Sequence, residues 1–175
     1  MLMNLVNLDP DIRTLMLQEV EYDVNCNKLY ISDRLNVIGR QIYLIILKDA
    51  IQNYDDSWLA NQINFKGLLN STESRNLKNK TIQVKMRSDA HEVLAEDEFN
   101  RFYMRGLCLY AISKKIASLK VYRAKETHHP RPESWRLIGT LIDPIELLED
   151  LRQNVGQPTR LGIGEAGSGL SVMIL

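Results

Sequence analysis

The apolar positions of residues 88–124 predict one long helix, a short turn and a strand, around which the rest of the chain is organised. Ser88 is the expected N-cap, because its hydroxyl can accept from the free N–H groups of the first turn. Gly106 costs about 1 kcal/mol relative to alanine inside a helix, so we expect another backbone to approach it closely. Leu119 and Val121 alternate with polar neighbours, as in a strand with one buried face. Apolar residues at helical spacing form a wide face on the helix: Phe99, Phe102, Tyr103, Leu107, Tyr110 and Ile112.

Periodic apolar segments with capping residues predict further helices on both sides of this centre. The Asp-Pro pairs at 9–10 and 143–144 combine a favoured N-cap with proline at the first helical position. The expected helices start at Pro10, at Asp33 or Asn36, at Asp55 or Asp56, and at Pro144. The second runs to Asn53, and one of its faces carries Ile38, Ile42, Ile45, Ile46 and Ala50. Tyr43, Leu44 and Leu47 widen this face, so we expect the helix to be buried on more than one side.

Short alternating or apolar segments predict strands at 28–31, 81–86 and 170–175, whereas the polar residues 69–80 predict a surface loop. Five glycines between positions 156 and 169 predict a flexible link. We therefore expect an α+β fold. Residues 1–155 form a single domain with four to five helices packed on a small mixed sheet, and residues 156–175 form the Gly-rich link and a C-terminal strand.

Composition limits the function classes. The chain has 175 residues, with Lys+Arg and Asp+Glu both 22, so a neutral net charge argues against non-specific nucleic-acid binding. A locally basic face remains open. No apolar run approaches the roughly 20 residues that span a bilayer, and no secretory signal is evident. Cys108 is expected as a small buried hydrophobe and Cys26 as a loop residue, without a disulfide.

Two motifs suggest cofactor or metal chemistry, but their contexts do not fit. Residues 162–167 match GxGxxG, yet only eight residues follow, too few to complete a dinucleotide-binding unit. His128 and His129 are adjacent, so on an extended chain they point to opposite faces, and no further zinc ligand is near. We expect no cofactor and no metal.

Carboxylates offer the next enzymatic interpretation. The consecutive acids Glu96, Asp97 and Glu98 could include a pair of catalytic carboxylates. The favoured interpretation is that they lie on a solvated face and complement the helix dipole. Gln83 and Lys85 on a strand are similar to an element of metal-dependent nucleases, although the companion acid is not evident. No nucleophile elbow supports a serine triad. We predict no catalytic residue.

Basic residues and the apolar end of the chain suggest protein interfaces instead. Arginine is favoured at interfaces because its planar fork makes bidentate bonds. The basic residues in question are Arg101, Arg105, Arg123, Lys125, Arg131 and Arg136. The interface interpretation is favoured for the cluster around Arg131, Glu133 and Trp135. The C-terminal strand, with Leu170, Val172 and Ile174, is expected to add to a sheet of its own subunit or of a neighbour.

Three strings carry a resemblance to a known family: EFNRFYMRGLC at 98–108, VYRAK at 121–125 and PRPES at 130–134. They resemble a family of small proteins of tailed bacteriophages and prophages, encoded among virion genes. The resemblance implies a context, virion assembly, and supplies no site residue.

The leading hypothesis is a non-enzymatic structural protein of the virion, a head–tail connector or neck component, assembled in the host cytoplasm. It implies a homo-oligomer in contact with portal, tail or major capsid protein, and neither a membrane nor a specific nucleic acid as partner. The alternatives are a capsid decoration protein, a phage-encoded metal-dependent nuclease and a small regulatory binding protein.

Overall fold

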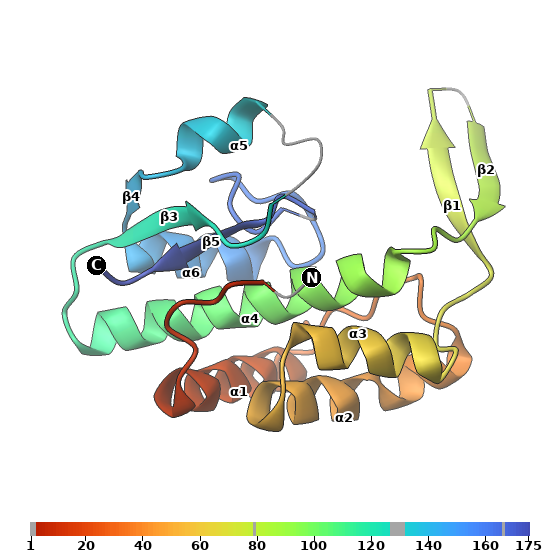
Figure 1. Cartoon of the computed structure of the whole chain (residues 1–175), viewed down its shortest axis with the longest axis horizontal. Helices are drawn as coiled ribbons and strands as arrows, with labels where there is room; N and C mark the ends of the chain where they lie inside the picture. The colour runs from red at the N-terminus through yellow and green to blue at the C-terminus, as the bar shows by residue number, and fades with distance from the viewer. Residues whose placement is uncertain (1–2, 79, 127–131, 166) are drawn as a thin grey trace.

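A long central helix, α4 (Ala90–Ser113), lies between two layers of the fold (Figure 1). The computed structural model describes residues 3–78, 80–126, 132–165 and 167–175. Helices α1 (Pro10–Asn25) and α3 (Asp56–Phe65) pack on one side of α4, and α2 (Val37–Asn53) packs on both of them. The opposite side of α4 carries α6 (Pro144–Gln153) and a small sheet. The expected α+β class is confirmed, with six helices in the described residues.

The strands form two separate antiparallel sheets rather than the single mixed sheet expected. One sheet has the order β4-β3-β5, from β3 (Leu119–Arg123), β4 (Leu141–Ile142) and β5 (Leu170–Met173). The short helix α5 (Pro132–Leu137) connects to β4 on the outer side of this sheet (Figure 1). The second sheet is the hairpin of β1 (Thr72–Leu77) and β2 (Lys80–Lys85).

Most predicted helix starts are confirmed by side-chain caps. The carboxylates of Asp9, Asp55 and Asp143, and the amide oxygen of Asn36, accept backbone N–H groups of the first turns that follow them. The expectation for Ser88 is wrong, because α4 begins at Ala90 with Asp89 at the N-cap. The Asp89 carboxylate makes no cap bond and instead pairs with Arg87.

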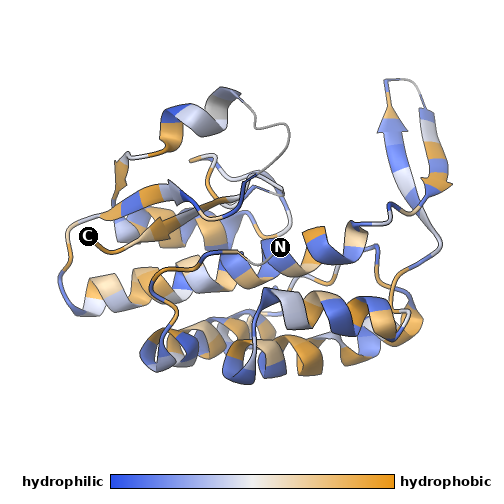
Figure 2. Ribbon diagram, in the orientation of Figure 1, coloured by the Kyte–Doolittle hydropathy of each residue, from blue (hydrophilic) through white to orange (hydrophobic). Residues whose placement is uncertain are grey.

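Helix α4 is buried around most of its circumference because helices and sheet cover it from both sides (Figure 2). Gly106 allows one of these contacts to be close. A Cβ atom there would lie 3.0 Å from the backbone N of Met16 and 3.1 Å from the carbonyl oxygen of Ile12. The predicted close approach of another backbone, that of α1, is therefore confirmed.

Helix α2 buries only part of the face expected, since Ile46 and Ala50 are buried as predicted. Ile38 and Ile45 are 61% and 68% exposed, whereas Tyr43, Leu47 and Ile51 are buried. Apolar residues surround most of this helix, so its period alone could not select the face that meets α1 and α3.

Two strand assignments were also wrong. Residues 28–31 run as an irregular segment, without a strand partner among the described residues. The polar residues 69–80, expected as a loop, contain β1, which pairs with the correctly predicted strand β2. Cross-strand bonds between side chains hold this polar ribbon: Gln83 donates to Ser74 at 2.6 Å, and Thr81 donates to Asn76 at 2.8 Å. Such pairs stabilise a ribbon without an apolar pattern.

The glycine-rich residues 156–165 and 167–169 pack on the domain rather than forming a free link. The Asp150 carboxylate accepts the backbone N–H groups of Arg160 and Leu161 at 2.9 and 2.8 Å. Gly164 has φ +81° and lies so close to Met104 that a Cβ would be 2.8 Å from its Cε. Among the described residues, no helix combines the length and the apolar character needed to cross a bilayer.

Candidate functional site

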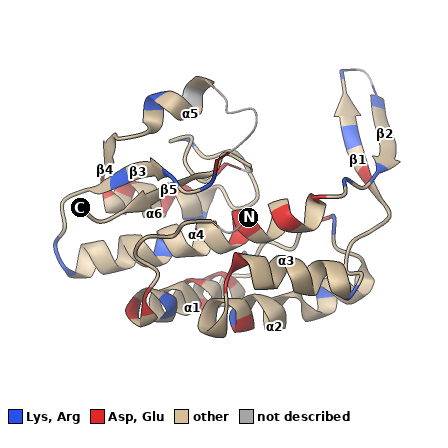
Figure 3. Cartoon of the chain, in the orientation of Figure 1, with Lys and Arg blue, Asp and Glu red and all other residues tan. Residues whose placement is uncertain are grey.

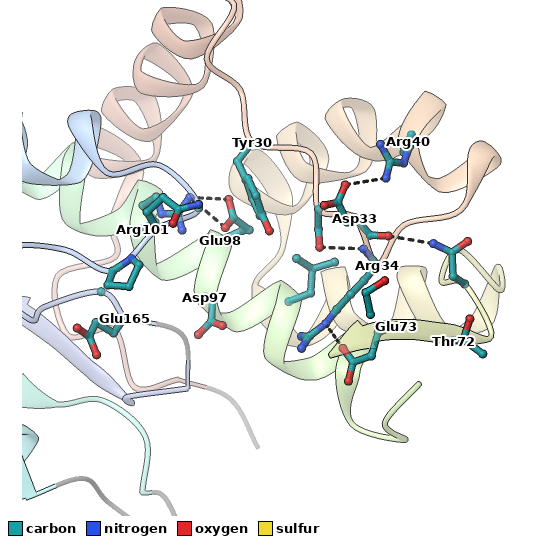
Figure 4. A pocket seen from close by; sticks show the side chains of 18 of the residues that line it. Tyr30, Asp33, Arg34, Arg40, Thr72, Glu73, Asp97, Glu98, Arg101 and Glu165 are labelled. Atoms are coloured by element: carbon teal, nitrogen blue, oxygen red, sulfur yellow. Dashed lines mark hydrogen bonds and ion pairs between the residues drawn. The ribbon is translucent and has the colours of Figure 1, made fainter. Parts of the chain in front are cut away.

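A polar cleft of about 830 Å³ lies at the base of the β1–β2 hairpin (Figure 4). Its walls come from residues 30–34, the hairpin base, the first turns of α4 and the glycine-rich segment near Gly164. These segments are far apart in sequence. They meet here because Leu35 bridges to Leu69 and because α4 starts directly after β2.

Three arginine–carboxylate pairs line the cleft. Arg34 Nε donates to Glu73 at 2.9 Å, and thereby fixes the hairpin base to the segment after α1. Arg40 Nη2 lies 3.0 Å from the Asp33 carboxylate at the rim. Arg101 Nη1 lies 3.1 Å from Glu98, and its Cζ is 5.6 Å from the centroid of the Tyr30 ring. Figure 4 shows Glu98, Arg101 and Tyr30 together on one side of the cleft.

Two consecutive carboxyl groups of α4 have raised pKa values. Burial, followed by the negative charge of Glu96, raises the pKa of Asp97 to about 6, although the Gly167 N–H donates to it at 2.8 Å. Burial raises the pKa of Glu98 to about 7, because the attraction of Arg101 only partly offsets the desolvation. Both carboxyl groups can therefore exchange protons close to neutral pH.

The Tyr43 hydroxyl lies buried close to this group and has no hydrogen-bond partner among the described residues. Burial, and then the charge of Glu98, raise the pKa of Tyr43 well above its ordinary value. A buried hydroxyl without a partner is unfavourable, because its desolvation is not compensated.

Carboxylates outnumber arginines in the lining of the cleft. The lining contains five carboxylates, of Asp33, Glu73, Asp97, Glu98 and Glu165, against three arginines. Each arginine faces one carboxylate, and Asp97 accepts the N–H of Gly167. The described residues contain no group of three His, Cys, Asp or Glu side chains that could hold a metal ion.

The structure corrects the expectation that the acids of α4 lie on a solvated face. Glu98 is 2% exposed, and both Asp97 and Glu98 line the cleft, while Glu96 pairs with Lys125. Arg101 and Arg105, expected among surface arginines, are also buried in ion pairs.

The interface residues predicted from the sequence lie away from the cleft. Trp135 is 58% exposed on α5, whereas Arg131 and the side chain of Glu133 lie outside the described residues, as do His128 and His129. Leu170 and Val172 are fully buried, and Ile174 packs against the core. Strand β5 pairs with β3 of its own subunit, which is one of the two alternatives expected for it.

The nuclease interpretation finds little geometric support in the hairpin. Gln83 and Lys85 lie on the face of the ribbon shared with Ser74 and Thr72, while Glu73 pairs in register with Val84 on the other face. No described acid of β1 therefore shares a face with Gln83 and Lys85.

The cleft residues that sequence reasoning missed are mainly Tyr30, Arg34 and Glu73. One signal was present: Glu98 and Arg101 stand three positions apart within the apolar stripe of α4, where unpaired charges are unfavourable. Their partners come from distant segments, which no local pattern reveals.

Comparison of the chain with family models, with curated proteins and with solved structures gives no match.

Proposed function

We propose that this chain is a non-enzymatic structural protein of a tailed-bacteriophage virion, a head–tail connector or neck component, which binds a neighbouring virion protein through the β1–β2 hairpin. One observation supports this most directly. The hairpin projects from the body and packs on no other helix or strand of the described chain beyond its base (Figure 1).

An isolated two-stranded hairpin is only marginally stable in water. Both strands of this one are edge strands, with unpaired N–H and C=O groups along their outer sides. Leu77 is 47% exposed, and no described element covers it. Such a ribbon gains most by adding to a partner sheet or by lying on a partner surface.

The charge of the hairpin indicates the kind of surface it fits. Arg75, Lys78, Lys80 and Lys85 are all exposed, against one carboxylate, that of Glu73, which is already paired with Arg34 (Figure 3). The partner surface is therefore acidic.

The resemblance of residues 98–108, 121–125 and 130–134 to proteins of tailed phages and prophages supplies the virion context. Portal, tail and major capsid proteins are the partners that this context offers, and a ring of identical subunits is the assembly it implies. A capsid decoration protein remains the alternative within the same class.

Removing the hairpin tests the proposal. Thr72 and Lys85 are register partners, so an Asn-Gly turn can replace residues 73–84 without moving the ends. The shortened protein should keep its melting temperature within a few degrees but disappear from virions, as measured by mass spectrometry of purified particles. The quadruple substitution of Arg75, Lys78, Lys80 and Lys85 by Gln is the matched control for charge. The proposal is contradicted if purified virions lack the intact protein. It is also contradicted if the shortened protein is incorporated into virions as well as the intact one.

The enzymatic alternative has its own test. The purified protein is incubated with DNA and Mg²⁺ or Mn²⁺, beside the Lys85→Ala variant. We expect no cleavage. Cleavage that is lost in Lys85→Ala would overturn the structural role in favour of a nuclease.

A further inference from the structure

The outer half of the β1–β2 hairpin carries one amphipathic face. Residues directly opposite each other in an antiparallel pair lie on the same face of the ribbon, and each strand alternates between the two faces. Arg75 lies opposite Ile82, and Leu77 lies opposite Lys80, so two cations and two apolar side chains share one face. Leu77 is 47% exposed, and the side chain of Arg75 is 55% exposed. We call these four residues the hairpin face.

The cations of the hairpin face are available to a partner. Arg75 Nη2 lies 4.0 Å from Glu73, at the limit of an ion pair, and that carboxylate is already bonded to Arg34 at 2.9 Å. Lys80 is exposed. Residues 72–85 hold four of the 22 basic residues of the chain but only one of its 22 acidic residues. The rest of the chain therefore carries the matching excess of three acids, which attracts the hairpin of another copy.

Part of this acidic excess lies where three helices end. Helices α1 and α3 begin there and α2 ends there (Figure 1), and Arg13 of α1 donates to the carbonyl oxygen of Ile51 in α2 at 2.6 Å. These helix ends carry four carboxylates, those of Asp9, Asp11, Asp49 and Asp55. None of the four takes part in an ion pair between described residues. The charge of Asp55 acts on Arg13, which leaves an excess of three negative charges. We call the four carboxylates the acidic end.

An exposed aromatic ring lies beside these carboxylates. Tyr54 directly precedes Asp55, is 44% exposed, and stacks on Trp58 with the ring centroids 4.3 Å apart and the planes at 7°. The stack holds the tyrosine ring in place. The acidic end therefore combines an apolar surface with carboxylates, as the hairpin face combines apolar side chains with cations.

The hairpin lies too far from the acidic end of its own chain to contact it. Helix α3 starts at the acidic end and is about 15 Å long, and the chain leaves its other end toward the hairpin (Figure 1). Figure 3 shows the basic residues of the hairpin projecting away from the helix ends where the acidic end lies. A contact between the two surfaces therefore joins two copies of the chain.

We propose that the hairpin face of one copy binds the acidic end of a second copy, with Leu77 and Ile82 on the Tyr54 ring and with Arg75 and Lys80 facing the carboxylates. This inference rests on the proposed function of the hairpin as a binding element, and it names the partner. The two surfaces differ, so the contact is heterologous. Identical subunits then join head to tail, and form a ring where the rotation between neighbours closes.

Charge reversal on either surface tests the contact in the purified full-length protein. The hairpin variant is Arg75→Glu with Lys80→Glu. The acidic-end variant is Asp11→Lys with Asp49→Lys, which leaves both capping residues of this end in place. Sedimentation velocity over a range of protein concentrations measures self-association. We expect the wild type to self-associate and each variant alone to do so about tenfold more weakly, because like charges then face each other.

A mixture of the two variants distinguishes a head-to-tail contact from other modes of association. The hairpin variant keeps a native acidic end, the acidic-end variant keeps a native hairpin, and their two reversed surfaces are complementary. An equimolar mixture should therefore recover the association of the wild type, which pairing of hairpins with hairpins would not allow. The matched control is Lys28→Glu with Lys66→Glu, which reverses two exposed charges outside both surfaces and should associate as the wild type does.

Two results overturn this inference: a wild-type protein that stays monomeric at every concentration, and a mixture that associates as weakly as each variant alone. The test of the proposed function in virions is separate. Hairpin-dependent incorporation of a protein that is monomeric in solution would assign the hairpin to a different virion protein. Incorporation without the hairpin, beside intact head-to-tail association in solution, would contradict the proposed function alone.

Discussion

Single buried charges determine how this protein responds to pH. Glu98 faces Arg101 at 3.1 Å but is almost completely removed from water. Desolvation penalises the ionised carboxylate more than the arginine stabilises it, so its pKa rises to about 7. The same penalty acts on Asp97 and on Asp56, whose pKa values rise to about 6. Above neutral pH the folded state therefore holds several carboxylates that would be better hydrated in the unfolded chain.

This difference predicts a loss of stability with rising pH. Below about pH 4 these groups are protonated in both states, and their contribution to stability is complete. Between about pH 4 and 7 the unfolded chain releases their protons first, so unfolding becomes progressively more favourable. For Glu98, the rise in pKa from 4.5 to about 7 corresponds to at most about 3 kcal/mol.

The Glu98→Gln variant isolates this contribution. We expect its free energy of unfolding, relative to wild type, to be higher at pH 8 than at pH 5 by about 1–3 kcal/mol, measured by urea unfolding at both pH values. The comparison between two pH values removes those effects of the substitution that do not depend on pH, such as a change in packing. Exposed Glu92→Gln is the control and should show almost no such difference. A Glu98→Gln curve parallel to wild type would show that Glu98 titrates as a solvated acid does.

At the scale of the elements, local patterns predicted most helices and failed for the hairpin. The Asp-Pro starts of α1 and α6 carry capping chemistry that acts within one turn, so the sequence alone locates them. Strand β1 has no apolar alternation, because neither of its faces lies on the core, and its polar side chains instead bond across the ribbon. The cleft could not be predicted from the sequence for a related reason: Arg34, Glu73 and Asp97 line the same cleft only after the whole domain has folded.

The C-terminal strand shows how one element can belong to the core although it ends the chain. Leu170 and Val172 have no exposed surface, and Asn100 of α4 donates to the carbonyl oxygen of Leu170 at 2.8 Å. Burying two such side chains contributes about 3–6 kcal/mol. This is a large share of the roughly 5–15 kcal/mol that stabilises a domain.

Deleting residues 170–175 should therefore unfold the monomer or lower its melting temperature strongly. Circular dichroism during thermal unfolding, together with gel filtration, measures this. Deletion of Leu175 alone is the matched control, since that side chain is 75% exposed, and it should change little. A truncated protein that stays folded but no longer assembles would instead make the strand an assembly arm.

At the scale of the whole molecule, a buried ion network joins the two layers across α4. Arg105 is fully buried and donates to Glu19 and to both oxygens of Asp23 at 2.7 Å. Arg152 of α6 completes the network with two bonds to Glu19, at 2.5 and 3.0 Å, so α1, α4 and α6 share one set of charges. Two carboxylates balance two guanidinium groups, and these pairings lower the pKa of Glu19 despite its burial. The network therefore helps to set how the helical layer and the sheet layer align on α4.

Removing only the central Arg105 should lower the free energy of unfolding far more than replacing the charges of the network together by neutral side chains. Arg105→Met leaves Glu19 and Asp23 buried with fewer partners, and we expect it to lower the free energy of unfolding by about 3–5 kcal/mol. Adding Glu19→Gln and Asp23→Asn to the same chain neutralises the stranded carboxylates, while Arg152 remains partly in contact with solvent. The triple variant should recover more than half of the loss, because well-packed neutral side chains replace buried ion pairs at little net cost. Urea unfolding at pH 7 compares the variants. If the triple variant is no more stable than Arg105→Met, the loss comes from the packing of the long arginine stem between the layers, and the charges contribute little to holding them together.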